Sequence, residues 1–278
     1  MTLFFTFLLP LLISFAIGQQ YGYQNQHNNY PSLDSSEKFP WVVAVLNTDD
    51  LFTRYIGSGS LIKPNVVLTA VHILNDISEN ELVVRAGEND ISTTQDQQHV
   101  DLKVLRIVAH EQFNKYNAEN NVALLILKSG FTMTRNIQTI ALYMGGGRVQ
   151  RNSCFFNGWG KEEWNSKDYP STLKNTKIEI IENDICQRIL GWPLSTRQFC
   201  AKGLQGKDCS GDGGAPVVCK TGENPYTLAQ VGVVNWGSRK PSDNKPTIYT
   251  NVYSLRGWIE YQLRLPANFV PDLIVEAV

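Results

Sequence analysis

The residues with the clearest chemical potential are a glycine-rich segment and one histidine. Residues 209–216 read CSGDGGAP, which places a thiol, a hydroxyl and a carboxylate among glycine N–H groups, and His72 ends the run LTAVH. Acyl transfer at a peptide carbonyl needs a hydroxyl or thiol nucleophile, an imidazole base, a carboxylate that fixes the imidazole tautomer, and two backbone N–H donors for the oxyanion. Acyl transfer is therefore the chemistry that these residue types suggest.

Short motifs elsewhere in the chain occur in a recognisable order. In chain order they are FPW at 39–41, LTAVH at 68–72, NVALL at 121–125, GWG at 158–160 and VNWG at 234–237. Together with residues 209–216 they resemble, in order and spacing, the landmarks of chymotrypsin-fold serine proteases from residue 39 to about residue 265. Within that group the motifs are most similar to insect serine protease homologues related to clip-domain proteases. No cysteine precedes Cys154, so we expect no cysteine-rich clip module.

Short strands must position these motifs. Apolar, β-rich runs bounded by turn residues occur at 41–46, 66–71, 122–127 and 231–236, and alternation at 100–108 predicts a half-exposed strand. Helical patterns are confined to 182–190 and 254–265. Many short strands with few helices are typical of an all-β barrel or sandwich. The resemblance implies two six-stranded antiparallel Greek-key β-barrels, trypsin-like, with a C-terminal helix.

Composition argues against several classes of partner and predicts a secreted protein. The 278 residues are 42% hydrophobic and carry a net charge of −1, so nothing favours nucleic acid or a membrane surface. Residues 1–18 form an apolar stretch that ends in small residues and predicts a signal peptide. A membrane anchor is disfavoured because this run is shorter than roughly 20 apolar residues and contains Pro10. We expect a flexible polar leader at 19–37, a trypsin-like homologue domain at 38–265 and a C-terminal tail at 266–278.

The resemblance assigns a role to each position of the catalytic machinery. It puts the base at His72, the carboxylate at Asn121 and the nucleophile at Gly213, where the signature G-D-S-G-G-P has serine. Glycine has no side chain to attack a carbonyl, and an amide in place of the carboxylate enforces the wrong tautomer. Gly211 and Gly213 would form a vestigial oxyanion hole. We therefore expect no catalytic residue, with His72 a leftover buried imidazole.

Specificity and activation residues have changed as well. The resemblance implies a vestigial specificity pocket in which Lys207 at the floor would repel Lys or Arg side chains and Thr247 would narrow the slot. An alternative alignment puts Asp208 at the floor. The other pocket positions are Asn235, Trp236 and Gly237. The resemblance also implies that Asp212 pairs with an ammonium freed by cleavage after Lys or Arg, but residues 19–37 contain neither. Because a buried carboxylate without a partner is costly, we expect Asp212 to be solvated or to have another donor.

Five cysteines fit an oxidising compartment. The resemblance implies disulfides between Cys154 and Cys219 and between Cys186 and Cys200. The bridge that usually lies beside the histidine has lost both cysteines, leaving Gly57 and Ile73. Cys209 is left unpaired, as a buried inert thiol or, alternatively, as an intermolecular disulfide or a thiol nucleophile.

No metal and no cofactor are expected. Glu88, Asp90 and Asp96 lie in the loop where some family members hold calcium, but acidic surface loops are common.

Three hypotheses about function remain. The first is a secreted, catalytically inactive homologue that binds extracellular proteins, such as proteases, their substrates or their inhibitors. It would act as cofactor, decoy or regulator of a proteolytic cascade, in insect immunity or reproductive fluid, with a possible disulfide-linked partner through Cys209. The second is a trypsin-family endopeptidase with rearranged chemistry that uses Ser210 or Cys209. The third is an extracellular recognition protein for microbial sugars or another ligand.

Overall fold

The structure is a computed structural model that describes residues 39–48, 53–93, 99–161, 170–203, 212–223, 227–236 and 245–266. The chain divides between Tyr30 and Pro31, and every described residue belongs to the unit Pro31–Val278. The predicted signal peptide, the polar leader and the tail beyond Pro266 lie outside the described residues. No helix within the described ranges is long and apolar enough to cross a membrane.

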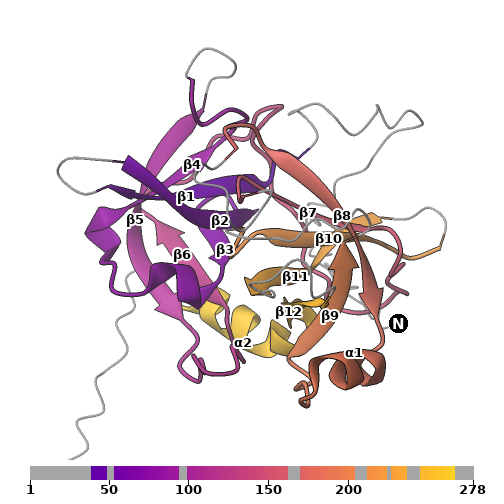
Figure 1. The fold of residues 1–278 in the computed structure, drawn as a ribbon. Helices are drawn as coiled ribbons and strands as arrows, with labels where there is room; N and C mark the ends of the chain where they lie inside the picture. The colour runs from indigo at the N-terminus through magenta and orange to yellow at the C-terminus, as the bar shows by residue number, and fades with distance from the viewer. Residues whose placement is uncertain are drawn as a thin grey trace, which may run out of the picture. The chain divides into compact units, whose positions relative to one another are not determined.

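Six strands from the N-terminal half close into the first barrel, drawn in indigo to magenta in Figure 1. They are β1 (Val42–Thr48), β2 (Thr53–Lys63), β3 (Val66–Thr69), β4 (Leu82–Ala86), β5 (Val100–Ala109) and β6 (Ala123–Leu127). All neighbours are antiparallel, in the order β1-β2-β3-β6-β5-β4. Valine and leucine side chains fill the interior, as β-branched and aliphatic residues do on a pleated, buried surface.

Six strands from the C-terminal half repeat this connectivity in a second barrel (Figure 1). They are β7 (Cys154–Gly158), β8 (Lys174–Ile181), β9 (Gln198–Gly203), β10 (Pro216–Thr221), β11 (Thr227–Trp236) and β12 (Thr247–Asn251). The closed order is β10-β11-β12-β9-β8-β7, again antiparallel throughout. Two six-stranded antiparallel barrels are the predicted fold class, which is confirmed.

Two α-helices complete the described chain. α1 (Asn183–Leu190) ends at Gly191, whose left-handed backbone (φ 82°) suits a residue without Cβ. α2 (Val252–Arg264) begins at Asn251, whose side chain accepts a hydrogen bond from the Ser254 N–H. Both helices fall within two residues of the ranges predicted from the sequence.

The core of the molecule includes a cluster that joins the two barrels. It contains Leu68 of β3, Leu124 of β6, Val233 of β11 and the buried face of α2. Ser60 in β2 also donates a buried hydrogen bond of 2.6 Å to Gln230 in β11. The facing edges of the barrels are therefore packed against each other, and the residues at the ends of β3, β6 and β11 are held at fixed positions.

Both disulfides implied by the resemblance are present. Cys154 of β7 is bonded to Cys219 of β10, and Cys186 of α1 is bonded to Cys200 of β9. The first closes a separation of 65 residues, for which the chain-entropy model gives about 4 kcal/mol of stabilisation. Cys209 lies outside the described residues.

Candidate functional site

Four residues from two barrels meet where the catalytic group was predicted. His72 lies in the 3-10 helix Val71–Leu74 that follows β3, and Asn121 lies two residues before β6. Gly213 lies in the turn that leads into β10, and Asn235 lies near the end of β11. The structure thus brings together all three predicted triad positions. It adds Asn235, which the sequence had indicated only as a pocket residue.

Two backbone groups fix the orientation of the two buried amides. The side-chain Nδ2 of Asn235 donates to the carbonyl of Ala118 at 2.9 Å, so its Oδ1 faces Asn121. The backbone N–H of His72 donates to Oδ1 of Asn121 at 3.0 Å, so Nδ2 of Asn121 faces the imidazole ring and Asn235. Amide orientations are assigned from such networks, and each of these two amides has an independent backbone anchor.

This orientation determines the tautomer of His72. The Asn121 Nδ2 lies 2.7 Å from Nδ1 of His72, and its second N–H donates a hydrogen bond to Oδ1 of Asn235. An amide NH₂ has donors and no acceptor, so Nδ1 must offer its lone pair and the ring proton must be on Nε2. The nitrogen that a general base would use is therefore already protonated in the neutral ring.

The ring is also held in its neutral form. Burial lowers the pKa of His72, because the charged imidazolium loses contact with water. The hydrogen bond with Asn121 does not oppose this lowering of the pKa. An amide raises the pKa of a histidine only when its oxygen accepts a proton from the ring, whereas Asn121 donates through Nδ2. We conclude that a second proton on Nδ1 would point at the NH₂ group of Asn121.

The space beside Nε2 leaves no room for a side chain at position 213. A Cβ built on Gly213 would lie 2.5 Å from Nε2 of His72 and 2.7 Å from Cγ2 of Ile73. Contacts this short require one of the groups to move. The position predicted for the nucleophile is therefore filled by its neighbours.

Ile73, which stands at one position of the lost disulfide, also fills the space beside Gly213. A Cβ on Gly57 would lie 2.7 Å from Cδ1 of Ile73 and 2.6 Å from the carbonyl oxygen of Gly213. One isoleucine side chain thus reaches both positions, Gly57 and Gly213. Sequence reasoning identified Ile73 and Gly57 only as the lost cysteine pair. The sequence did contain a signal for this contact. A large residue, Ile73, and two glycines, Gly57 and Gly213, occupy positions that the fold brings together.

Asp212 has a partner that the sequence did not reveal. Its side chain is fully buried, so the predicted solvated alternative is wrong. Oδ1 accepts a hydrogen bond of 2.7 Å from the Gly160 N–H, and Oδ2 lies 3.5 Å from Nζ of Lys174, so the alternative of another donor is confirmed. Burial raises the pKa of Asp212, and Lys174 and the Gly160 N–H oppose that rise.

Two side chains of the predicted specificity pocket, those of Thr247 and Asn235, lie in the described part of the chain. Thr247 is buried in β12, and Asn235 is turned toward Asn121. Outside the described residues lie Lys207, Asp208, Cys209, Ser210, Gly211 and Gly237, and for Trp236 only the backbone is described. Of the two predicted oxyanion donors, only Gly213 is therefore in the described chain.

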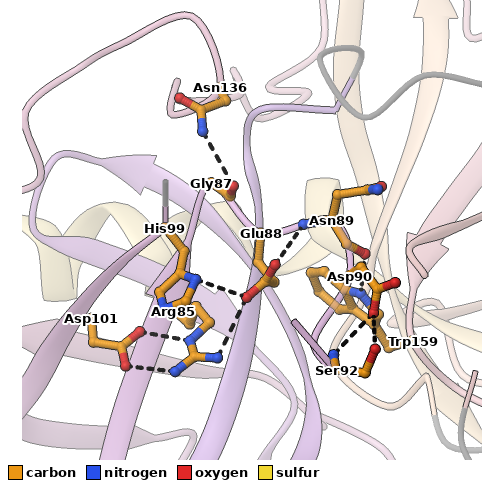
Figure 2. Close-up of polar contacts among 10 residues, drawn as sticks. All are labelled: Arg85, Gly87, Glu88, Asn89, Asp90, Ser92, His99, Asp101, Asn136 and Trp159. Carbon is orange, nitrogen blue, oxygen red and sulfur yellow. Dashed lines mark hydrogen bonds and ion pairs between the residues drawn. The ribbon is translucent and has the colours of Figure 1, made fainter. Parts of the chain in front are cut away.

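The acidic loop after β4 turns its carboxylates toward groups of the protein (Figure 2). Oε2 of Glu88 lies 3.1 Å from Nδ1 of His99 and 3.4 Å from Nη1 of Arg85, and its side chain is fully buried. Arg85 also forms two hydrogen bonds with Asp101, which raise the pKa of the guanidinium.

The other two acidic residues of this loop are Asp90 and Asp96. Oδ1 of Asp90 accepts hydrogen bonds from the backbone and hydroxyl of Ser92, and Asp96 lies outside the described residues. In the described part of the chain no three His, Cys, Asp or Glu residues form a group that could hold a metal ion. The described groups around the Glu88 carboxylate are thus the Arg85 guanidinium, the His99 ring and the Asn89 N–H.

Known proteins similar to this chain point to one family. The family model described as Trypsin matches residues 32–259. Phenoloxidase-activating factor 2 of Galleria mellonella is 34% identical over 243 residues, which are 80% of each chain. Two proteins of Anopheles gambiae named inactive CLIP domain-containing serine proteases A8 and A28 are 33% and 32% identical over 80% and 83% of this chain. The alignments cover 64% and 63% of those two relatives, so the chain spans slightly less than two thirds of their length.

Proposed function

The chain belongs to the trypsin family, and we propose that it is a secreted member without peptidase activity that acts by binding other proteins. In this proposal it is a cofactor, decoy or regulator of an extracellular proteolytic cascade. The observation that carries the proposal is the closure at position 213. A glycine stands where the family has its nucleophile, and His72 and Ile73 occupy the volume that a side chain would need.

The tautomer of His72 supports the same conclusion independently. In the reference enzyme of this family, replacing the aspartate by asparagine lowers kcat by about four orders of magnitude because the imidazole takes the wrong tautomer. In this chain the Asn121 Nδ2 faces Nδ1 of His72, which favours the same wrong tautomer. Adding a hydroxyl alone would therefore leave the base unable to accept its proton.

The names of the relatives support the regulatory half of the proposal. Two of them are named inactive proteases, and a third is named a phenoloxidase-activating factor. A fold does not determine a function, so the role in a cascade rests on this likeness and on the loss of the catalytic groups. Secretion is supported by the apolar residues 1–18 and by the two disulfides.

Hydrolysis of a diverse peptide library tests the loss of activity. The purified chain and its His72→Ala variant should give the same background cleavage. Cleavage by the parent chain that disappears in His72→Ala would overturn the proposal and favour a rearranged enzyme that uses Ser210 or Cys209. The matched variant is needed because traces of a contaminating protease would survive in both preparations.

Affinity capture from the relevant extracellular fluid tests the mode of action. We expect proteases, their substrates or their inhibitors to be recovered with the chain. Recovery of sugar polymers with no cascade protein would contradict a regulatory role and favour an extracellular recognition protein.

A further inference from the structure

The Asp212 carboxylate is enclosed by the turn of residues 158–160 and by Lys174. Oδ1 accepts the Gly160 N–H, and Oδ2 faces Nζ of Lys174 at 3.5 Å. A Cβ at either Gly158 or Gly160 would collide with this carboxylate. The two glycines are therefore required by the approach of the carboxylate, and the GWG motif is part of its binding site.

The turn that carries Asp212 is linked to both barrels. The carbonyl of Gly213 accepts a hydrogen bond of 3.0 Å from the N–H of Ser58 in β2. The N–H of Gly214 donates to the carbonyl of Val234 in β11, also at 3.0 Å. The turn that follows Asp212 therefore contacts one strand of each barrel.

A second chain of contacts reaches the loop after β4. Trp159 lies between the two glycines, is fully buried, and donates from Nε1 to the carbonyl of Asn89 at 2.9 Å. Figure 2 shows this contact beside the charged residues around Glu88. A displacement of the GWG turn would therefore disturb the first barrel as well.

Lys174 supplies the positive charge from inside the fold. It is the first residue of β8 and is paired in register with Gly158 of β7, so strand pairing alone brings its side chain to Asp212. The lysine side chain is 17% exposed and the carboxylate is not exposed, in contrast to the exposed pair Arg188–Asp184 on α1. An ion pair with so little solvent is weakly screened, and removal of one partner leaves a buried charge.

We propose that Lys174 is a built-in counter-ion that sets the turn around Asp212 without cleavage of the chain. The ammonium that the family resemblance expects from a newly cut amino terminus comes instead from a side chain. The turn at residues 212–214 then has its final arrangement in the intact chain, and a partner can bind to this region before any protease has acted. This inference concerns the conformation of the turn and does not depend on the loss of peptidase activity.

Hydrogen–deuterium exchange on the intact secreted chain tests the proposal. The peptides to follow contain residues 158–160 and 212–215, with peptides from β6 as an internal reference. The variants are Lys174→Met, the double variant Lys174→Met/Asp212→Asn, and Arg188→Met as a matched loss of an exposed ion pair. Parent samples are compared before and after limited proteolysis within residues 19–38.

The intact parent should be protected at both peptides, and cleavage should leave this protection unchanged. Lys174→Met should exchange at least about 10-fold faster there while β6 is unaffected, since the charge left behind is buried. The double variant should regain protection because it leaves no buried charge, and Arg188→Met should match the parent. If Lys174→Met does not fold, protection in a folded double variant supports the proposal.

Three results would overturn the proposal. Unchanged protection in Lys174→Met would show that the lysine does not set the turn. Loss of protection, or of folding, in both variants would show that the uncompensated charge of Asp212 is not what disturbs the turn. Protection of the parent that appears only after cleavage would show that a new amino terminus is required.

Discussion

At the scale of single residues, the site is determined by what neighbouring groups donate and by how much space they leave. Asn121 faces the imidazole with a donor, and Gly213 faces it with no side chain. These two facts do not describe the site completely, because a serine could be introduced at position 213. The contact distances around Gly213 show that restoration would also require His72 and Ile73 to move.

Substitution of Gly213 measures this lack of space. Gly213→Ala should lower the free energy of unfolding by about 1–3 kcal/mol because of overpacking against His72 and Ile73. The matched control is Gly257→Ala in α2, where a Cβ meets nothing within 4 Å and better helix propensity should add up to about 1 kcal/mol. Urea denaturation of both variants checks this, and a Gly213→Ala protein as stable as the parent would show that the space is open.

The Gly213→Ser variant tests whether restoring a hydroxyl at this position restores peptidase activity. We expect no measurable peptidase, because the Nε2 of His72 still holds its proton and the new hydroxyl still meets Ile73. Robust amide hydrolysis by this single variant, absent from Gly213→Ser/His72→Ala, would show that the other losses matter little.

The tautomer of His72 can be observed directly. In the parent, ¹⁵N NMR of the imidazole should show a neutral ring protonated at Nε2 with a pKa below its usual range. Asn121→Asp should raise the pKa of His72, since a carboxylate accepts from Nδ1–H and stabilises the charged ring. His110, whose pKa is also lowered by burial, stacks on Trp258 and should titrate as in the parent. A parent ring protonated at Nδ1 would contradict an Asn121 amide that points its Nδ2 at the ring.

At the scale of elements, the pairing of strands and the position of turns bring the interacting side chains together. Lys174 reaches Asp212 because β7 and β8 pair in register, and Ile73 reaches Gly213 because the 3-10 helix after β3 lies opposite the turn before β10. The sequence predicted the strands at 41–46, 66–71 and 100–108 and both helices from periodicity and turn residues. It did not predict these two contacts, because each joins residues that are distant in the chain and carry no local pattern.

The pH dependence of stability tests the element that holds Asp212. Because burial raises the pKa of Asp212, the folded chain binds more protons than the unfolded chain between about pH 3.9 and the raised value, and stability falls as pH rises through that window. Lys174→Met removes a group that opposes the rise, so the pKa should rise further. The loss of unfolding free energy relative to the parent should be small near pH 4 and should reach about 3–5 kcal/mol at neutral pH.

Urea denaturation at several pH values gives this difference, and other titrating groups cancel in the comparison. Arg188→Met should stay within about 0.5 kcal/mol of the parent throughout, because its ion pair is exposed. A loss in Lys174→Met that is constant from pH 4 to pH 7 would mean that charge on Asp212 is not the cause.

At the scale of the whole molecule, two barrels of the same connectivity place their functional residues on facing edges. The sequence was sufficient for this level, because the ordered motifs resemble a known family and that resemblance implied two six-stranded barrels and both disulfides. The short strands by themselves indicated only a barrel or a sandwich. The triad positions followed from the same motifs. What could not be predicted was how His72, Ile73 and Asn235 repack once the nucleophile is gone, since that depends on side-chain volume in three dimensions.

We propose that the described residues at the barrel interface present no nucleophile beside His72 that can take up an acyl or phosphonyl group. Intact-mass spectrometry after incubation with a fluorophosphonate probe measures this directly, with an active trypsin as positive control. We expect the mass of the chain to remain unchanged while the control is fully modified. A stoichiometric adduct on the parent chain that is absent from His72→Ala would contradict the account.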